Sequence, residues 1–150
     1  MPNGNKFTMA RLLGIDWGSK RIGIALSDEM GIMAFTPLSA IINDNKVLKK
    51  IGTIIKKEKV KQVVLGMPIS LNGGRGKSAE SVLKFGDLLK KSYGIQINYL
   101  DERFTTGLAT RKLRETGAKN KLKGEIDNAV AQILLQQYLD KNKKTNEQKD

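Results

Sequence analysis

Three acidic residues stand where a folded chain could bring carboxylates together. Asp16 ends a short apolar run, Glu102 follows another apolar run, and Asp127 lies in the first turn of the last predicted helix. In an α/β sheet, ligand sites gather just beyond the carboxyl ends of strands, where Asp16 and Glu102 are expected. Carboxylates held close together repel each other unless a cation neutralises them. Two divalent ions about 3.5–4 Å apart could do so and could catalyse in-line displacement at a phosphodiester.

Each of these residues also has a purely structural interpretation. Asp16 could start a turn by bonding the backbone that follows it. Glu102 could form a surface ion pair with the adjacent Arg103, which would stabilise the fold little. Asp127 could simply complement the positive end of a helix dipole. The three residues together favour a metal site more strongly than any one of them does alone.

The amino-acid composition narrows the chemistry. The chain of 150 residues contains no cysteine and no histidine, which excludes disulfides, zinc sites built on those ligands and nucleophiles activated by histidine. Carboxylate oxygens prefer hard cations, so we expect Mg²⁺ or Mn²⁺, as two ions. A net charge of +12 favours a polyanionic partner such as nucleic acid, although it could also serve solubility alone.

Neither a membrane segment nor a signal peptide is expected. No run approaches the roughly 18 apolar residues that span a bilayer, and the first residues are polar. We therefore expect a cytoplasmic protein that does not bind membranes. Residues 1–10 are interpreted as an N-terminal extension, 11–140 as one domain, and 141–150 as a flexible basic tail.

The apolar pattern predicts an α/β fold that positions these carboxylates. Two apolar strands, 11–16 and 21–27, form a hairpin, and a third short strand covers 31–35. Apolar residues then recur at helical spacing from 45, and strands alternate with helices afterwards. The later elements are strand 63–66, a helix from 78 to Gly94, strand 95–100, a helix capped by Thr105 or Thr106, and a helix from Ile126. This order predicts a mixed sheet with helices on both faces.

Four segments of the sequence resemble the motifs of one family. Residues 14–25, Gly-Ile-Asp-Trp-Gly-Ser-Lys-Arg-Ile-Gly-Ile-Ala, resemble the opening motif of the YqgF family, which is also called RuvX. Residues 66–73 resemble its Gly-Leu-Pro loop, residues 101–106 its Asp-Glu-Arg motif, and residues 121–131 its closing basic loop and helix. The match runs from Arg11 to Leu139, with Met67 in place of the usual Leu and Val130 where Ala is common.

The resemblance implies an RNase H-like fold related to the RuvC resolvases. It also implies a catalytic carboxylate triad, which maps to Asp16, Glu102 and Asp127. The implied activity is an endonuclease that processes the 5′ end of pre-16S rRNA in ribosome biogenesis. A Holliday junction resolvase acting on branched DNA is the alternative within the same chemistry, and the fold does not decide between the two substrates.

Basic and hydroxyl residues near the expected site are candidates for contact with the substrate. Each basic residue could instead be a solvated charge, and Thr106 could cap its helix. The candidates are Lys20, Arg21, Arg75, Lys77, Arg103, Thr106, Lys121 and Lys123.

Alternatives of other classes remain open. A non-catalytic nucleic-acid-binding protein could keep the same fold and charge. Residues 16–20 also resemble the first phosphate loop of actin-like ATPases and sugar kinases. Those enzymes close two such domains on a nucleotide, for which a chain of 150 residues is short. A monomer or a weak homodimer is expected.

Overall fold

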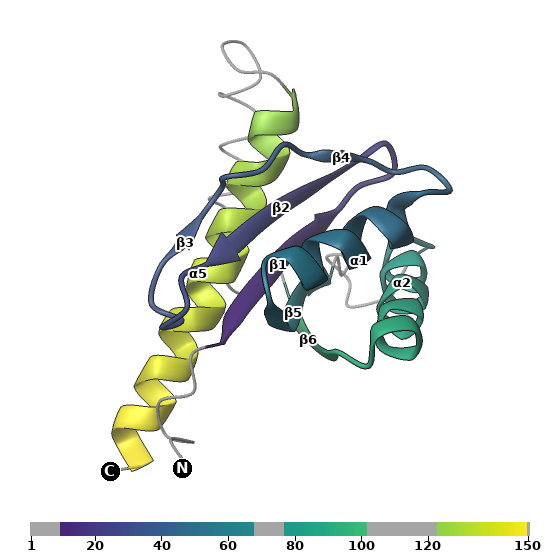
Figure 1. The fold of residues 1–150 in the computed structure, drawn as a ribbon. Coiled ribbons are helices and arrows are strands. Elements are labelled where there is room, and N and C mark those ends of the chain that lie inside the picture. Colours follow the sequence, from purple (N-terminus) through teal and green to yellow (C-terminus); the bar gives the residue numbers. More distant parts are fainter. Residues whose placement is uncertain (1–9, 68–76, 102–122, 150) are drawn as a thin grey trace.

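The computed structural model describes the backbone of residues 10–67, 77–101 and 123–149, and their side chains except those of 77, 78, 123 and 144–149. Within these ranges, no helix is long and apolar enough to cross a membrane. The elements are β1 (Arg11–Trp17), β2 (Arg21–Ser27), β3 (Ala34–Phe35), β4 (Ile41–Ile42), α1 (Val47–Lys57), β5 (Val60–Met67), α2 (Lys77–Tyr93), β6 (Gln96–Asp101) and α5 (Lys123–Lys149) (Figure 1).

The strands form one mixed sheet in the order β3-β2-β1-β5-β6, with β4 also paired to β2. β1 and β2 are the antiparallel hairpin that the sequence predicts. β5 lies parallel to β1, and β6 lies parallel to β5. Parallel pairing brings the carboxyl ends of β1, β5 and β6 to one edge of the sheet, which is where the predicted ligands were expected.

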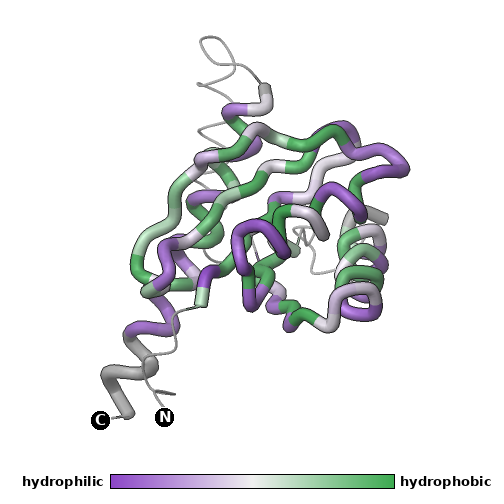
Figure 2. Tube along the Cα trace, viewed as in Figure 1, coloured by the Kyte–Doolittle hydropathy of each residue, from purple (hydrophilic) through white to green (hydrophobic). Residues whose placement is uncertain are grey.

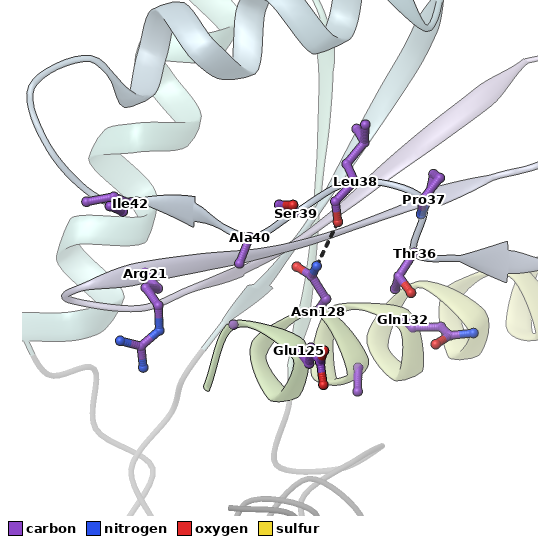
Figure 3. A pocket seen from close by; sticks show the side chains of 12 residues that line it. Arg21, Thr36, Pro37, Leu38, Ser39, Ala40, Ile42, Glu125, Asn128 and Gln132 are labelled. Atoms are coloured by element: carbon purple, nitrogen blue, oxygen red, sulfur yellow. Dashed lines mark hydrogen bonds between the residues drawn. The ribbon is translucent and has the colours of Figure 1, made fainter. Parts of the chain in front are cut away.

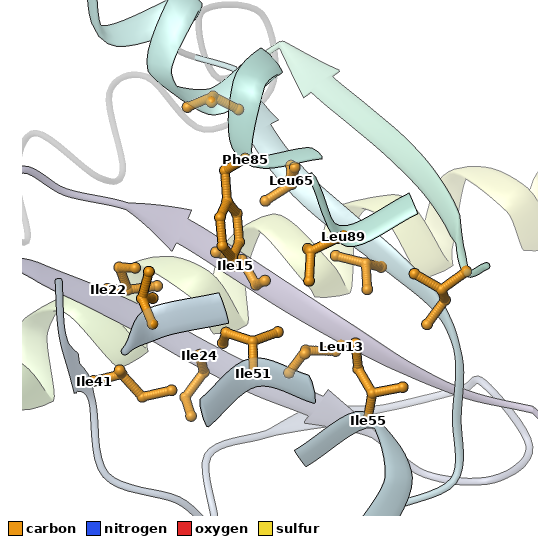
Figure 4. Packing of buried hydrophobic residues seen from close by; sticks show 14 of the residues in the cluster. Leu13, Ile15, Ile22, Ile24, Ile41, Ile51, Ile55, Leu65, Phe85 and Leu89 are labelled. Carbon is orange, nitrogen blue, oxygen red and sulfur yellow. The ribbon is translucent and has the colours of Figure 1, made fainter. Parts of the chain in front are cut away.

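One apolar core lies between the sheet and helices α1 and α2 (Figure 4). Apolar residues of α1 recur on one side of the helix, while lysines occupy its exposed side, as the hydrophilic stretches of α1 in Figure 2 show. Trp17 packs on Phe85 of α2 with ring centroids 4.4 Å apart. The largest fully buried members of this core are Leu13, Ile15, Ile22, Ile24, Leu26, Ile51, Val63, Leu65 and Leu89.

A second core lies between the opposite face of the sheet and α5. Small residues of the hairpin let the helix approach closely, since a Cβ atom at Gly14 would lie 2.8 Å from Cβ of Leu135. Helices therefore cover both faces, as predicted, and among the described helices it is α5 that covers the face on which the site is built (Figure 1). The members of this core include Leu12, Ala25, Val64, Leu100, Val130, Ala131, Leu134 and Leu135.

The structure corrects some predicted boundaries. The strand predicted at 31–35 is wrong for its first residues, because Asp28 accepts the backbone N–H groups of Ile32 and Met33 at 2.7 and 2.8 Å and holds them in a turn. β4 is an additional short strand that the sequence does not predict. α5 begins at Lys123, before the predicted residue 126, and its backbone is helical as far as Lys149. The helix predicted after Thr105 or Thr106 lies outside the described residues.

Candidate active site

Asp16 lies near the carboxyl end of β1, on the face of the sheet that α5 covers. Side chains alternate along β1, so that Leu13 and Ile15 enter the core under α1 and α2, while Leu12 and Gly14 face α5. Asp16 is the next residue on the same side as Leu12 and Gly14, facing α5, and it is only 4% exposed. Because burying a carboxylate is costly unless polar or cationic groups surround it, this position is unusual for a residue that merely starts a turn.

The first turn of α5 lies directly on β2, beside Asp16. Asp16 is paired in register with Gly23 of β2. A Cβ atom at Gly23 would overlap the carbonyl group of Asp127, so only glycine leaves room for the helix at this point. The strand pairing and the helix contact together bring Asp16 and Asp127 to one face of two adjacent strands.

Asn128 fixes this turn of α5 to two other segments. Its Oδ1 accepts the backbone N–H of Ile24 at 2.8 Å, and its Nδ2 donates to the carbonyl oxygen of Leu38 at 2.8 Å. Asn128 is 8% exposed, and its bond to Ile24 is buried and shielded from competing water, while its bond to Leu38 is partly buried. The location of Asp127 is therefore set by its neighbour in the helix as well as by packing on Gly23.

Arg21 forms an ion pair with Asp127. Its Nε donates to Oδ2 of Asp127 at 2.9 Å, and the two side chains are 34% and 20% exposed. Partly exposed pairs of this kind stabilise a fold by only about 0.2–1 kcal/mol. The main effect of the pair is therefore to orient the Asp127 carboxylate and to place a positive charge next to the site.

The other predicted site residues fall into two groups: those within the described residues and those outside them. Lys20 is exposed in the turn between β1 and β2, and its carbonyl oxygen accepts the backbone N–H of Asn43 at 2.9 Å. Lys77 begins α2 and Lys123 begins α5, and their side chains are not described. The remaining predicted residues lie outside the described residues: Arg75, Glu102, Arg103, Thr106 and Lys121.

The carboxylates that the structure brings together fit part of a site for a hard cation. Asp16 and Asp127 offer only oxygen ligands, which Mg²⁺ and Mn²⁺ prefer. In the part of the chain that the structure describes, no group of three or more acidic, histidine or cysteine side chains could hold an ion. The third predicted ligand, Glu102, directly follows Asp101, the last residue of β6. The described ranges thus hold two of the three predicted ligands.

Sequence reasoning missed the role of Asn128. The available signal was a polar residue on an apolar helical face, three and seven residues before Ala131 and Leu135. A buried asparagine in that position needs partners, and it finds them in Ile24 and Leu38. No local pattern identified those partners, because both lie about a hundred residues earlier in the chain.

The mixed sheet, with helices on both faces and carboxylates at its carboxyl edge, defines the class of RNase H-like proteins. Among solved structures, RuvC from Thermus thermophilus in complex with Holliday junction substrate matches with a TM-score of 0.60 and 11% identity, over 86% of this chain and 93% of that chain. A further Thermus thermophilus RuvC structure matches with a TM-score of 0.55 and 10% identity, over the same shares of the two chains. These likenesses establish the fold, and the predicted fold class is confirmed.

The chain belongs to the RuvX family. The family model described as "Holliday junction resolvase" matches residues 10–141. A relative from Sulfurihydrogenibium sp. (strain YO3AOP1) is 45% identical over 93% of this chain and 96% of its own length. One from Lactococcus lactis subsp. lactis (strain IL1403) is 38% identical over 87% of this chain and 94% of its own length. Both carry the name "Putative pre-16S rRNA nuclease". The predicted family is confirmed, and with it the prediction that the chain is a nuclease.

Proposed function

We propose that this chain is a metal-dependent endonuclease whose catalytic metal ligands are Asp16, Glu102 and Asp127. One observation carries the proposal: Asp16 is in register with Gly23, and the main chain of Asp127 packs on that same Gly23. Residues far apart in the sequence thus supply two carboxylates to one face of the sheet. Mg²⁺ or Mn²⁺, as two ions, would supply an activated water and neutralise the leaving oxygen.

The support for Glu102 as the third ligand is indirect. Met67 of β5 pairs with Asp101 of β6, so these strands end together at the carboxyl edge near Asp16. Leu100 of β6 packs in the core beneath α5. Side chains alternate along a strand, so we expect the residue two positions after Leu100 to face the same side as Asp16 and Asp127.

Arg21 is the best-supported residue for contact with a phosphate. Its Nε is used by Asp127, and a guanidinium carries two further amino groups that can bind a phosphate oxygen pair. We assign Lys20, Arg75, Lys77, Arg103, Lys121 and Lys123 to the same role of neutralising the substrate backbone, with Thr106 as a hydroxyl donor.

The favoured substrate is the 5′ region of pre-16S rRNA, acted on in the cytoplasm by a monomer or a weak homodimer. The names of relatives that match over nearly their whole length support this choice. The net charge of +12 suits any nucleic acid. Branched DNA is the second candidate, supported by the description of the family model.

The proposal is tested by cleavage assays with the whole chain. Labelled pre-16S rRNA fragments and four-way DNA junctions are incubated with Mg²⁺, with Mn²⁺ or with EDTA. We expect cleavage only with metal, and a loss of at least about 100-fold in rate for Asp16→Asn and Asp127→Asn. Asp87→Asn, a charge-matched change at an exposed position of α2, serves as the control and should cut like the wild type.

Three results would contradict the proposal or part of it. Cleavage that survives Asp16→Asn or Asp127→Asn at the wild-type rate excludes the proposed ligands. Cleavage in EDTA excludes the metal mechanism. Tight binding of either substrate without any cleavage favours the non-catalytic nucleic-acid-binding protein instead.

A further inference from the structure

A groove runs alongside the candidate active site, between residues 36–42 and the first turns of α5 (Figure 3). We call it the connector groove. Its volume is about 730 Å³, within the range of roughly 300–1,000 Å³ typical of pockets for small organic ligands. Arg21, which holds Asp127, lies at one end of it, and Gln132 of α5 lines it farther along the helix.

Hydrogen bonds fix both walls of the connector groove. Asn128 of α5 donates to the carbonyl oxygen of Leu38 at 2.8 Å, and Gln132 donates to that of Ala34 at 3.0 Å. Asn43, which directly follows residues 36–42 (the connector), donates from its side chain to the carbonyl oxygen of Gly18 at 2.7 Å. The connector is thus tied to α5 and to the β1–β2 turn, so the groove is preformed.

The residues that line the connector groove offer the three kinds of contact that a nucleotide requires: hydrogen bonds, an apolar surface and a positive charge. Thr36 and Ser39 are exposed hydroxyls that can donate and accept, and Glu125 can accept a bond from a base amino group. Ile42, 61% exposed at the rim, offers an apolar surface to the face of a base. Arg21 is the cation for a phosphate.

We propose that the connector groove binds single-stranded nucleotides of the substrate next to the bond that is cut. This inference rests on the proposed nuclease function and adds to it the form of the substrate. A duplex keeps its bases stacked inside, whereas single strands turn bases outward onto apolar surfaces and hydroxyl or amide groups. Two lining residues connect the groove to the candidate site: Arg21, which pairs with Asp127, and Asn128, the next residue of α5. A strand leaving the active site past Arg21 would therefore meet the hydroxyl and apolar groups of the groove.

The test measures binding separately from cleavage. A labelled single-stranded RNA of about eight nucleotides and a blunt RNA duplex are titrated with the whole chain in EDTA, and fluorescence anisotropy gives each Kd. Ser39→Trp fills the groove from an exposed position, and Ile42→Glu places a negative charge on its rim. Ser92→Trp is the matched control, since Ser92 is an exposed serine of α2 on the opposite face of the sheet.

We expect Ser39→Trp and Ile42→Glu to weaken single-strand binding by roughly tenfold, with duplex binding nearly unchanged. Thermal unfolding at the wild-type temperature shows that each variant is folded. Single-strand affinity equal to that of Ser92→Trp in both variants overturns the inference. So does an equal loss for single strand and duplex, because that result indicates a general charge or folding effect.

Cleavage assays distinguish failure of this inference from failure of the proposed function. Substrates with and without a single-stranded extension are compared in the presence of metal. If the wild type cuts neither while Ser39→Trp still loses single-strand binding, the nuclease proposal fails and the groove assignment stands. If cleavage depends on Asp16 but Ser39→Trp binds and cuts extended substrates normally, the groove assignment fails and the nuclease proposal stands.

Discussion

Arg21 and Asp127 are joined by a hydrogen-bonded ion pair of 2.9 Å across 106 residues of sequence. The pair couples the start of β2 to the first turn of α5, and it engages Oδ2, one of the two carboxylate oxygens of a proposed metal ligand. A cation bound by Asp127 would therefore compete with the positive guanidinium for this carboxylate. The balance between them is accessible to experiment.

Replacing Arg21 should make metal binding easier and cleavage poorer. In Arg21→Ala, we expect the metal concentration for half-saturation to fall by up to about fivefold, which corresponds to the roughly 1 kcal/mol of a partly exposed pair. The maximal cleavage rate should fall because a phosphate contact is lost. Calorimetric titration with Mn²⁺ measures the first effect, and Lys20→Ala controls for the removal of a nearby positive charge. A higher metal requirement in Arg21→Ala would contradict competition for Asp127.

Adding one methyl group at Gly23 should displace the first turn of α5. The new Cβ atom overlaps the carbonyl group of Asp127, and backbone atoms cannot move aside as a flexible side chain can. We expect Gly23→Ala to lower the free energy of unfolding by about 1–3 kcal/mol or more, as overpacking commonly does. Urea denaturation measures the loss. In Gly124→Ala the new Cβ atom would lie 3.3 Å from Cβ of Ala40, so a much smaller change is expected there. Equal stabilities of these two variants would refute the close contact.

Removing the Asn128 amide should cost more than removing an exposed one. Asn128→Ala leaves the buried N–H of Ile24 and the carbonyl oxygen of Leu38 without this partner. The buried N–H of Ile24 accounts for about 1–3 kcal/mol of lost unfolding free energy, and the partly buried bond to Leu38, which lines the connector groove, adds little because water can replace it. Asn98→Ala, which removes a half-buried bond to Gln62, should cost about 1 kcal/mol or less. Chemical denaturation measures both variants, and similar losses for Asn128→Ala and Asn98→Ala would argue against a role for Asn128 in holding α5 to β2.

The turn after β2 should weaken in acid. Burial raises the pKa of Asp28, but hydrogen bonds from the backbone N–H groups of Met33, Ile32 and Met30 outweigh it and hold the pKa below the ordinary value of 3.8. A lowered pKa in the folded state means that ionised Asp28 stabilises the fold fully at neutral pH, and that this contribution disappears as the pH falls through the lowered value. We expect the Tm difference between wild type and Asp28→Ala to be constant near neutrality and to shrink below pH 3.8. A Tm difference independent of pH would be evidence against the prediction.

The strands were predictable because burial leaves a dense signal in the sequence. β1 covers the apolar run at 11–16 and one further residue, Trp17. β2 has the predicted bounds, 21–27, and forms the predicted hairpin with β1. A strand with both faces covered must be apolar almost throughout, so local composition was sufficient. β4 could not be found in this way, because two residues are too few for a period, and the bonds around it depend on Asn43 and Lys20.

The relationships within the site were less predictable than its members. Asp16 and Asp127 could be selected from their places on a strand and a helix, and the structure brings them to one face. The pairing of Arg21 with Asp127 had no signal in the sequence, since arginine at a strand start suits a solvated charge equally well. The periodicity of α5 shows which side of the helix is apolar but not which strand it covers, and that depends on the small residues Gly14 and Gly23.

The packing of α5 on the hairpin also has a consequence during protein synthesis. β1 and β2 leave the ribosome long before α5 does, since Arg21 is translated 106 residues ahead of Asp127. Until α5 arrives, the apolar face formed by Leu12, Ala25 and their neighbours lacks the helix that packs on it in the folded chain, and Asp16 lacks the Asp127 carboxylate with which we propose that it binds metal. A nascent chain is thus expected to be both prone to aggregation and catalytically silent, and to acquire solubility and activity in the same step.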